Sequence, residues 1–118
     1  MKKFNFPASQ RLKLKNDFEN VFKSGKKLMT TDITLWYSPV GKIKKCRLGI
    51  IVSKRLGQAV ERNRVKRLIR ETFRLNKHLL ADFDIILYPR NKESFSDFRN
   101  TQQKVLNLLR KAGIYKND

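Results

Sequence analysis

A run of basic residues between positions 54 and 74 is the part of this sequence best suited to bind a charged partner. Only two carboxylates, Glu61 and Glu71, lie among eight basic residues: Lys54, Arg55, Arg62, Arg64, Lys66, Arg67, Arg70 and Arg74. A planar guanidinium donates paired hydrogen bonds that match phosphate oxygens and base edges. Most charge runs are solvated faces with both signs present, but here the two signs are too unequal to neutralise each other. The run therefore favours binding to nucleic acid.

Aromatic residues form a second constellation. Phe18 and Phe22 are four residues apart, which places them on one face of a helix. Trp36 alternates with Ile33, Leu35 and Tyr37, so it lies on the opposite side of a strand if those three face the core. Aromatic rings stack on any base, which suits a protein that binds many different single strands. Phe18 and Phe22 are interpreted equally well as core residues, and both roles can hold in part.

The sequence offers little for catalysis by the protein itself. His78 is the only histidine and Cys46 the only cysteine, which excludes the usual zinc sets and histidine-based triads. Asp82 and Asp84 lie close in sequence, but turn chemistry at the start of a strand explains them. We expect no catalytic residue and no metal site in the chain, and a reduced, partly buried Cys46.

The strongest helix signal covers residues 59–76 and carries the basic run. Apolar residues fall on one side of it at helical spacing, so packing that side forces Asn63 and the arginines into solvent on the other. The core-facing residues of this stripe are Val65, Leu68, Ile69, Thr72 and Phe73.

Other elements are predicted around this helix. A short first helix begins at Asn16, with Glu19 as its capping-box partner, and stops at Gly25 in a left-handed conformation. Residues 28–38 and 47–53 alternate as strands, and Gly49 leaves room for a close approach. Residues 83–88 form a buried strand. A last helix opens near Ser94 or Ser96 and is stopped by Gly113. The order predicts an α+β fold with helices packed on one sheet.

Length and charge limit the class of protein. The 118 residues suit a single domain, 1–118, with a basic arm at residues 1–15. The net charge of +18 makes a polyanion the natural partner, with nucleic acid ahead of an anionic membrane surface. No apolar run is long enough to span a membrane, and the N-terminal residues lack the apolar stretch of a signal peptide. We expect a cytoplasmic protein.

The segments LGIIVSKRLG (residues 48–57) and ERNRVKRLIRE (residues 61–71) resemble the signature of the bacterial ribonuclease P protein component, with its Arg-Asn-Arg core at residues 62–64. The resemblance extends to NDFENVFKSG at 16–25, ITLWY at 33–37, DIILYPR at 84–90 and a closing helix with a hydrophobic-Tyr-Lys tail. It thus covers nearly the whole chain. The family usually has a tyrosine where Trp36 stands.

The resemblance implies a function and a set of sites. The protein would bind one catalytic RNA and help it remove the 5′ leader from precursor tRNA, while the RNA holds the catalytic Mg²⁺ ions and the protein alone binds no cofactor. A cleft between the first helix and the sheet would bind the leader through Phe18, Phe22, Trp36 and Tyr115. The catalytic RNA would contact Lys54, Arg55, Arg62, Asn63, Arg64, Lys66, Arg67, Arg70 and Arg74.

The resemblance also implies a central mixed sheet with three helices and a left-handed βαβ crossover, like domain 2 of ribosomal protein S5. Parallel crossovers are right-handed in about 98% of cases, so pattern alone favours the other hand. Two other functions compete on charge and size: a ribosomal or general structured-RNA-binding protein, and a module that lays the basic helix in the DNA major groove. The family resemblance predicts neither DNA nor a membrane as partner.

Overall fold

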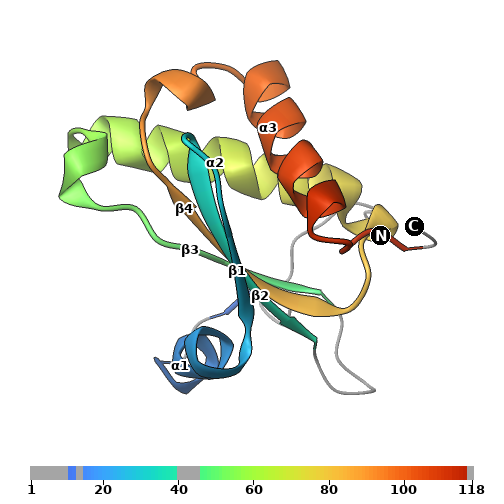
Figure 1. Cartoon of the computed structure of the whole chain (residues 1–118). Coiled ribbons are helices and arrows are strands. Elements are labelled where there is room, and N and C mark those ends of the chain that lie inside the picture. Colours follow the sequence, from blue (N-terminus) through green and yellow to red (C-terminus); the bar gives the residue numbers. More distant parts are fainter. Residues whose placement is uncertain (1–10, 13–14, 40–45, 117–118) are drawn as a thin grey trace, which may run out of the picture.

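The computed structural model describes residues 11–12, 15–39 and 46–116. Within them a four-stranded mixed sheet has the order β1-β2-β4-β3, built from β1 (Lys26–Met29), β2 (Ile33–Pro39), β3 (Arg47–Ile50) and β4 (Phe83–Pro89). The sheet separates α1 (Lys15–Ser24) on one face from α2 (Ala59–Asn76) and α3 (Phe98–Lys111) on the other (Figure 1). This is the predicted α+β domain with three helices and a mixed sheet.

The main core lies between the sheet and the α2–α3 layer. Alternation along the strands sends Ile33, Leu35, Ile85 and Leu87 into this core, where the apolar sides of both helices cover them. A smaller cluster lies under α1 and contains Val21 and Ile86, with Trp36 packed against them. Trp36 is therefore on the face opposite Ile33 and Leu35, as the alternation predicts.

The sheet combines antiparallel and parallel pairing. β2 pairs antiparallel with both β1 and β4, whereas β3 and β4 are parallel neighbours connected through α2. Three short 3₁₀ segments complete the described chain: η2 (Lys54–Leu56), η3 (Lys77–Leu79) and η4 (Glu93–Phe95). The left hand implied for the β3–α2–β4 crossover stays a prediction.

The predicted strand at residues 28–38 is wrong in its outline, because two strands and a tight turn occupy residues 26–39. The Thr30 hydroxyl accepts hydrogen bonds from the backbone N–H groups of Asp32 (3.3 Å) and Ile33 (3.1 Å). A threonine side chain thus builds this turn without the glycine or proline that usually marks a turn in sequence. Strand β3 is also shorter than predicted and ends at Ile50.

Helix ends follow the prediction in part. Helix α2 has the predicted bounds, and its capping box joins the Gln58 backbone N–H to Glu61 Oε1 at 2.9 Å. Helix α3 begins later than expected because Asp97 caps it, accepting the Asn100 N–H at 2.8 Å. Gly113 has the expected positive φ, 75°.

The start and stop of α1 are corrected by the structure. Asn16 lies inside α1 and does not cap it, since the helix already includes Lys15. Gly25 lacks the predicted left-handed conformation, because only Gly57 and Gly113 have positive φ among the described glycines. A Cβ atom at Gly25 would instead collide with the carbonyl oxygen of Val21 and lie 2.6 Å from that of Tyr37, so the last turn of α1 and the close approach of β2 together require glycine there.

Candidate nucleic-acid interface

The predicted RNA-contacting residues gather on one side of α2 and on η2 directly before it. We call these nine residues the basic face: Lys54, Arg55, Arg62, Asn63, Arg64, Lys66, Arg67, Arg70 and Arg74. Within it Asn63, Arg64, Arg67 and Arg70 are exposed, as are Lys54 and Arg55, while Arg62, Lys66 and Arg74 are half-buried. The core-facing residues Val65, Ile69, Thr72 and Phe73 fix this orientation, because their burial rotates the arginines outward.

Both carboxylates of α2 are held by cations. Glu61 accepts the Gln58 N–H and pairs with Lys92, and these hydrogen bonds lower its pKa below the ordinary value. Glu71 accepts the Arg74 Nε at 3.1 Å, and this contact lowers the pKa of Glu71. Each carboxylate therefore stays ionised and neutralises one neighbouring cation, which leaves the remaining cations of α2 to set the charge of its surface.

The arginines of the basic face are engaged to different degrees. Arg64 donates to the backbone carbonyl of Ser96 and Arg74 is paired with Glu71, so part of their hydrogen-bonding capacity is used within the fold. No ion pair to Arg67 or Arg70 is found in the described part of the chain. Both guanidinium groups are exposed, so they can reach an anion bound to this side of α2.

An aromatic patch lies on the opposite face of the sheet, beside α1. We define it as Phe22, Trp36 and Tyr88. The Phe22 and Trp36 ring centroids are 5.1 Å apart at an interplanar angle of 88°, and Trp36 and Tyr88 are 6.4 Å apart. Phe22 is 42% exposed, so this patch presents a large apolar ring to solvent. The Lys27 Nζ lies 5.5 Å from the Trp36 ring centroid and places a cation at the edge of the patch.

Phe18 is half-buried, so part of its side chain packs in the core and part is exposed. Its ring packs beside Leu12 and Val21 in the smaller cluster and over the backbone of Gly49. A Cβ atom at Gly49 would be 2.7 Å from two carbons of the Phe18 ring, so glycine is needed for this contact. The room predicted beside Gly49 is therefore filled by the first helix of the same chain.

Helix α1 is also fixed to the sheet by charge. The Arg47 guanidinium donates to both carboxylate oxygens of Asp84, at 2.8 and 2.7 Å, and lies 3.6 Å from Asp17 on α1. The hydrogen bond to Asp84 raises the pKa of Arg47 further above its ordinary value. The half-buried bidentate pair thus anchors the helix that carries Phe18 and Phe22.

The structure places Tyr115 away from the other predicted leader-contacting residues. After Gly113 the chain turns back along η3, where Tyr115 forms an antiparallel bridge with Leu80 and packs against the main core. The Arg110 guanidinium lies 4.3 Å from its ring centroid. Tyr115 thus packs on the α2–α3 side of the sheet, away from α1, because the C-terminal pairing holds it there, and its contact with the leader stays a prediction.

Sequence reasoning did not single out Tyr88, Met29 or Arg90. Tyr88 follows Ile86 by two residues in β4, so both side chains point to the α1 side of the sheet. The alternation in residues 83–88 could therefore have placed Tyr88 on this side. Met29 is 52% exposed on β1, and the Arg90 Nη1 approaches its sulfur at 2.6 Å. No local pattern joins these two residues, which are brought together by strand pairing alone.

A pocket of about 240 Å³ lies at the β3 edge of the sheet, between α1 and the basic face. Arg70 of the basic face lines it together with Phe18, and Arg11 contributes a second guanidinium. The remaining lining residues are Leu12, Leu48, Gly49 and Ile50. An apolar floor between two cations suits a nucleotide, whose base is apolar on its faces and whose phosphate is anionic.

Further properties of the described residues bear on catalysis and location. They contain no group of three or more His, Cys, Asp or Glu side chains placed to hold a metal ion. Cys46 is buried, and burial raises the pKa of its thiol to about 12, so it is no nucleophile at neutral pH. None of the helices seen here has the length and apolar character to cross a bilayer.

Comparison with known proteins gives one consistent result. The family model described as Ribonuclease P matches residues 6–113. A ribonuclease P protein component from Thermotoga maritima is 39% identical over 112 residues, which cover 91% of this chain and 95% of its own. The structure resembles the RNase P protein of Staphylococcus aureus, with a TM-score of 0.81, 31% identity and coverage of 91% of this chain and 98% of the other. It also resembles the RNase P protein from T. maritima, with a TM-score of 0.76, 40% identity and coverage of 86% and 96%.

Proposed function

Because this chain belongs to the family of ribonuclease P proteins, the protein component of an endoribonuclease, we propose that it binds ribonuclease P RNA and assists removal of the 5′ leader from precursor tRNA in the cytoplasm. The basic face would bind the catalytic RNA. The aromatic patch would bind the single-stranded leader. The protein would work as a binding subunit, and the RNA would carry the chemistry.

The observation that carries this proposal is one pocket lined by residues from both layers of the fold. Arg70, on the basic face, and Phe18, beside the aromatic patch, line the same cavity although they belong to opposite layers of the fold. A structured RNA bound along α2 would therefore lie next to a strand running over the α1 side of the sheet. This is the geometry needed to hold a substrate strand close to a catalytic RNA.

The two surfaces suit different kinds of RNA. Exposed guanidinium groups on a rigid helix bind phosphates of a folded RNA, and the affinity depends steeply on salt. Exposed rings stack on unpaired bases with little regard to sequence, since every base has a π-face. Leaders of different precursors differ in sequence, so stacking on Phe22, Trp36 and Tyr88 would accept many of them. Lys27 at the edge of the patch would hold a leader phosphate.

The Mg²⁺ needed by the holoenzyme is assigned to the RNA. Phosphate oxygens of RNA supply the ligands that Mg²⁺ prefers, whereas the described residues contain no group of three or more His, Cys, Asp or Glu side chains placed to hold a metal ion. The protein would contribute cationic side chains that lie close to crowded RNA phosphates.

The test is cleavage of a precursor tRNA at low Mg²⁺ by a bacterial ribonuclease P RNA, with and without the full-length protein. We expect no cleavage by the protein alone and restored cleavage when both are present. The comparison variant has Arg67 and Arg70 changed to Ala, and we expect it to retain the fold and to lose RNA affinity, because both side chains are exposed. Cleavage by the protein alone would reveal an unrecognised active site.

Binding without stimulation would favour a ribosomal or general RNA-binding function. A preference for duplex DNA over structured RNA in the same binding assay would favour a DNA-binding module. The affinities for ribonuclease P RNA, for another structured RNA and for duplex DNA are therefore compared at one salt concentration. Affinities for nucleic acid are comparable only at fixed salt.

A further inference from the structure

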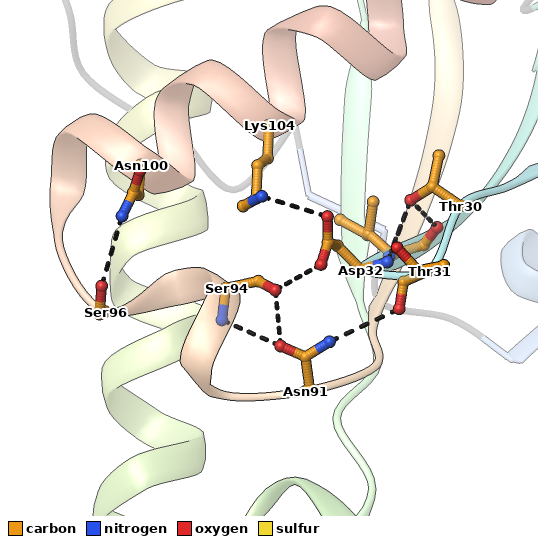
Figure 2. A network of polar contacts seen from close by, with 9 residues as sticks. Thr30, Thr31, Asp32, Asn91, Ser94, Ser96, Asn100 and Lys104 are labelled. Carbon is orange, nitrogen blue, oxygen red and sulfur yellow. Dashed lines mark hydrogen bonds and ion pairs between the residues drawn. The ribbon is translucent and has the colours of Figure 1, made fainter.

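A second pocket, of about 210 Å³, lies between the β1–β2 turn and α3. It is outside both the basic face and the aromatic patch. Its walls combine residues of the turn with residues of one side of α3: Thr30, Asp32, Ile33, Lys104, Asn107, Leu108 and Lys111. The polar network that bounds it connects the turn, the loop after β4 and α3 (Figure 2).

The one carboxylate in this pocket is committed to the fold. Asp32 accepts a hydrogen bond from Ser94 Oγ through one oxygen and from Lys104 Nζ, at 3.1 Å, through the other. Both contacts lower the pKa of Asp32 below its ordinary value. Asn91 in turn accepts the Ser94 N–H at 2.9 Å and holds that side chain in place (Figure 2). The Thr30 hydroxyl is likewise used, since it donates to the Ile33 carbonyl.

Of the donors that face the pocket from α3, Asn107 and Lys111 are less engaged than Lys104, which holds Asp32. Asn107 and Lys111 follow Lys104 by three and seven residues, so the three side chains share one side of the helix. Lys111 is exposed, and no ion pair to it is found within the described residues. Two lysines against one aspartate leave the pocket with a net positive charge.

The place of this pocket in the fold separates it from the basic face. The sheet order β1-β2-β4-β3 puts the β1–β2 hairpin at the edge opposite β3. The pocket with Arg70 is at the β3 edge, whereas Lys104 and Lys111 lie beside the hairpin. An RNA segment that covers the Arg67–Arg70 side of α2 would leave the α3 pocket open to another segment.

We propose that Lys104, Asn107 and Lys111 bind a backbone phosphate of an RNA segment distinct from the one held by the basic face. This inference rests on the proposed function, because it takes the partner to be RNA. Lysine is suited to the role as a hydrated point charge that contacts phosphate without a fixed fork geometry. The protein would thus clamp RNA from two edges of its sheet, which adds phosphate contacts and steepens the salt dependence of binding.

The first experiment measures the affinity of full-length protein for ribonuclease P RNA over a series of salt concentrations. The variant is Asn107→Ala/Lys111→Gln, with Lys104 retained because it also holds Asp32. We expect about twofold to fivefold weaker binding and a slope of log K against log salt reduced by about 1. The control is Arg99→Gln, which removes the same charge from another side of α3 and should leave the slope unchanged.

The second experiment locates the RNA with a cleavage probe attached to a cysteine placed at residue 111 or at residue 67. Cys46 is buried with a pKa of about 12, so the introduced thiol is modified selectively. We expect the two probes to cut different RNA segments. Cuts from residue 67 without cuts from residue 111, or equal slopes for the variant and its control, would refute the second contact and leave the proposed function intact.

Two further outcomes are informative. One distinguishes free phosphate from RNA phosphate as the ligand of the pocket, and the other distinguishes failure of this inference from failure of the proposed function. Inorganic phosphate alone should bind no tighter than millimolar, because one phosphate supplies only one of the contacts of an RNA. Tight calorimetric binding of phosphate that is lost in Asn107→Ala/Lys111→Gln, with RNA affinity unchanged, would assign the pocket to a small anion and overturn the inference. Failure of the unmodified protein to bind the RNA at all would instead overturn the proposed function.

Discussion

The ring of Phe18 lies directly over Gly49, so close that two of its carbons would be 2.7 Å from a Cβ atom at that position. This contact joins α1 to β3 at the place where the β3-edge pocket opens. Glycine at position 49 thus allows α1 to pack closely against β3. Both residues of this contact line the β3-edge pocket between α1 and the basic face.

The substitution Gly49→Ala is expected to displace α1. The added methyl group collides with the Phe18 ring, and overpacking of this kind costs about 1–3 kcal/mol in free energy of unfolding. We expect a lower thermal midpoint and weaker binding of leader-bearing precursor. The control is Gly113→Ala, where no atom lies within 4 Å of the added Cβ and only the positive φ is penalised, at about 1 kcal/mol. Equal thermal shifts without any difference in precursor binding would contradict this role of Gly49.

Arg67→Ala and Arg70→Ala should each weaken binding to ribonuclease P RNA and reduce the salt slope by about 1, because each removes a phosphate contact. Arg74→Ala is the matched comparison on the same helix. Its guanidinium is already paired with Glu71, so its removal should change the slope less. Filter binding or fluorescence titration at four salt concentrations measures all three. Identical slopes for the three variants would show that engagement with Glu71 does not matter.

Trp36→Ala and Tyr88→Ala should weaken binding of precursor tRNA more than binding of mature tRNA, since only the precursor has a leader to stack on the rings. Loss of one stacked base costs about 1–3 kcal/mol, or roughly fivefold to 150-fold in affinity. Tyr115→Ala should change the ratio of precursor to mature affinity less, because Tyr115 packs on the opposite layer. Circular dichroism of each variant checks the fold. An equal loss for both tRNA forms would assign Trp36 and Tyr88 to packing.

Asp32→Asn should destabilise the fold at neutral pH and have little effect in strong acid. Asp32 has a lowered pKa in the folded protein, because Ser94 and Lys104 hold its ionised form. Its stabilisation is therefore complete well above the ordinary value of 3.8 and disappears as the pH falls through its folded pKa. We expect a cost of about 1 kcal/mol at pH 7.

Thermal unfolding of both proteins between about pH 7 and pH 2 tests this expectation. The two midpoints should approach each other at the acid end. Glu19→Gln, on an exposed residue of α1, removes one negative charge as Asp32→Asn does, so it is a control for the change of net charge and should show a smaller shift of the midpoint at pH 7. A constant difference between Asp32→Asn and the unmodified protein across this range would show that shape, and not charge, makes Asp32 important.

The central helix shows how far local sequence reaches in this protein. The bounds of α2 and its outward arginines follow from an apolar stripe at helical spacing, which acts within a few turns of one segment. The side of β2 that carries Trp36 follows in the same way from alternation. The charge excess is a property of composition, and the α+β order follows from the succession of local patterns along the chain, so both were likewise readable.

Tertiary structure alone decided which elements meet. Tyr88 and not Tyr115 stands beside Trp36, because the pairing of β2 with β4 brings Tyr88 to the α1 face while the Leu80–Tyr115 bridge holds the other tyrosine on the far layer. The hairpin at Thr30 depends on side-chain hydrogen bonds that leave no repeat in the sequence. The requirement for glycine at position 49 depends on a contact between segments distant in sequence. Local periodicity in the sequence determines helices and strands, because the backbone geometry repeats within each of them. Which helices and strands pack together depends on packing and strand register across the whole chain.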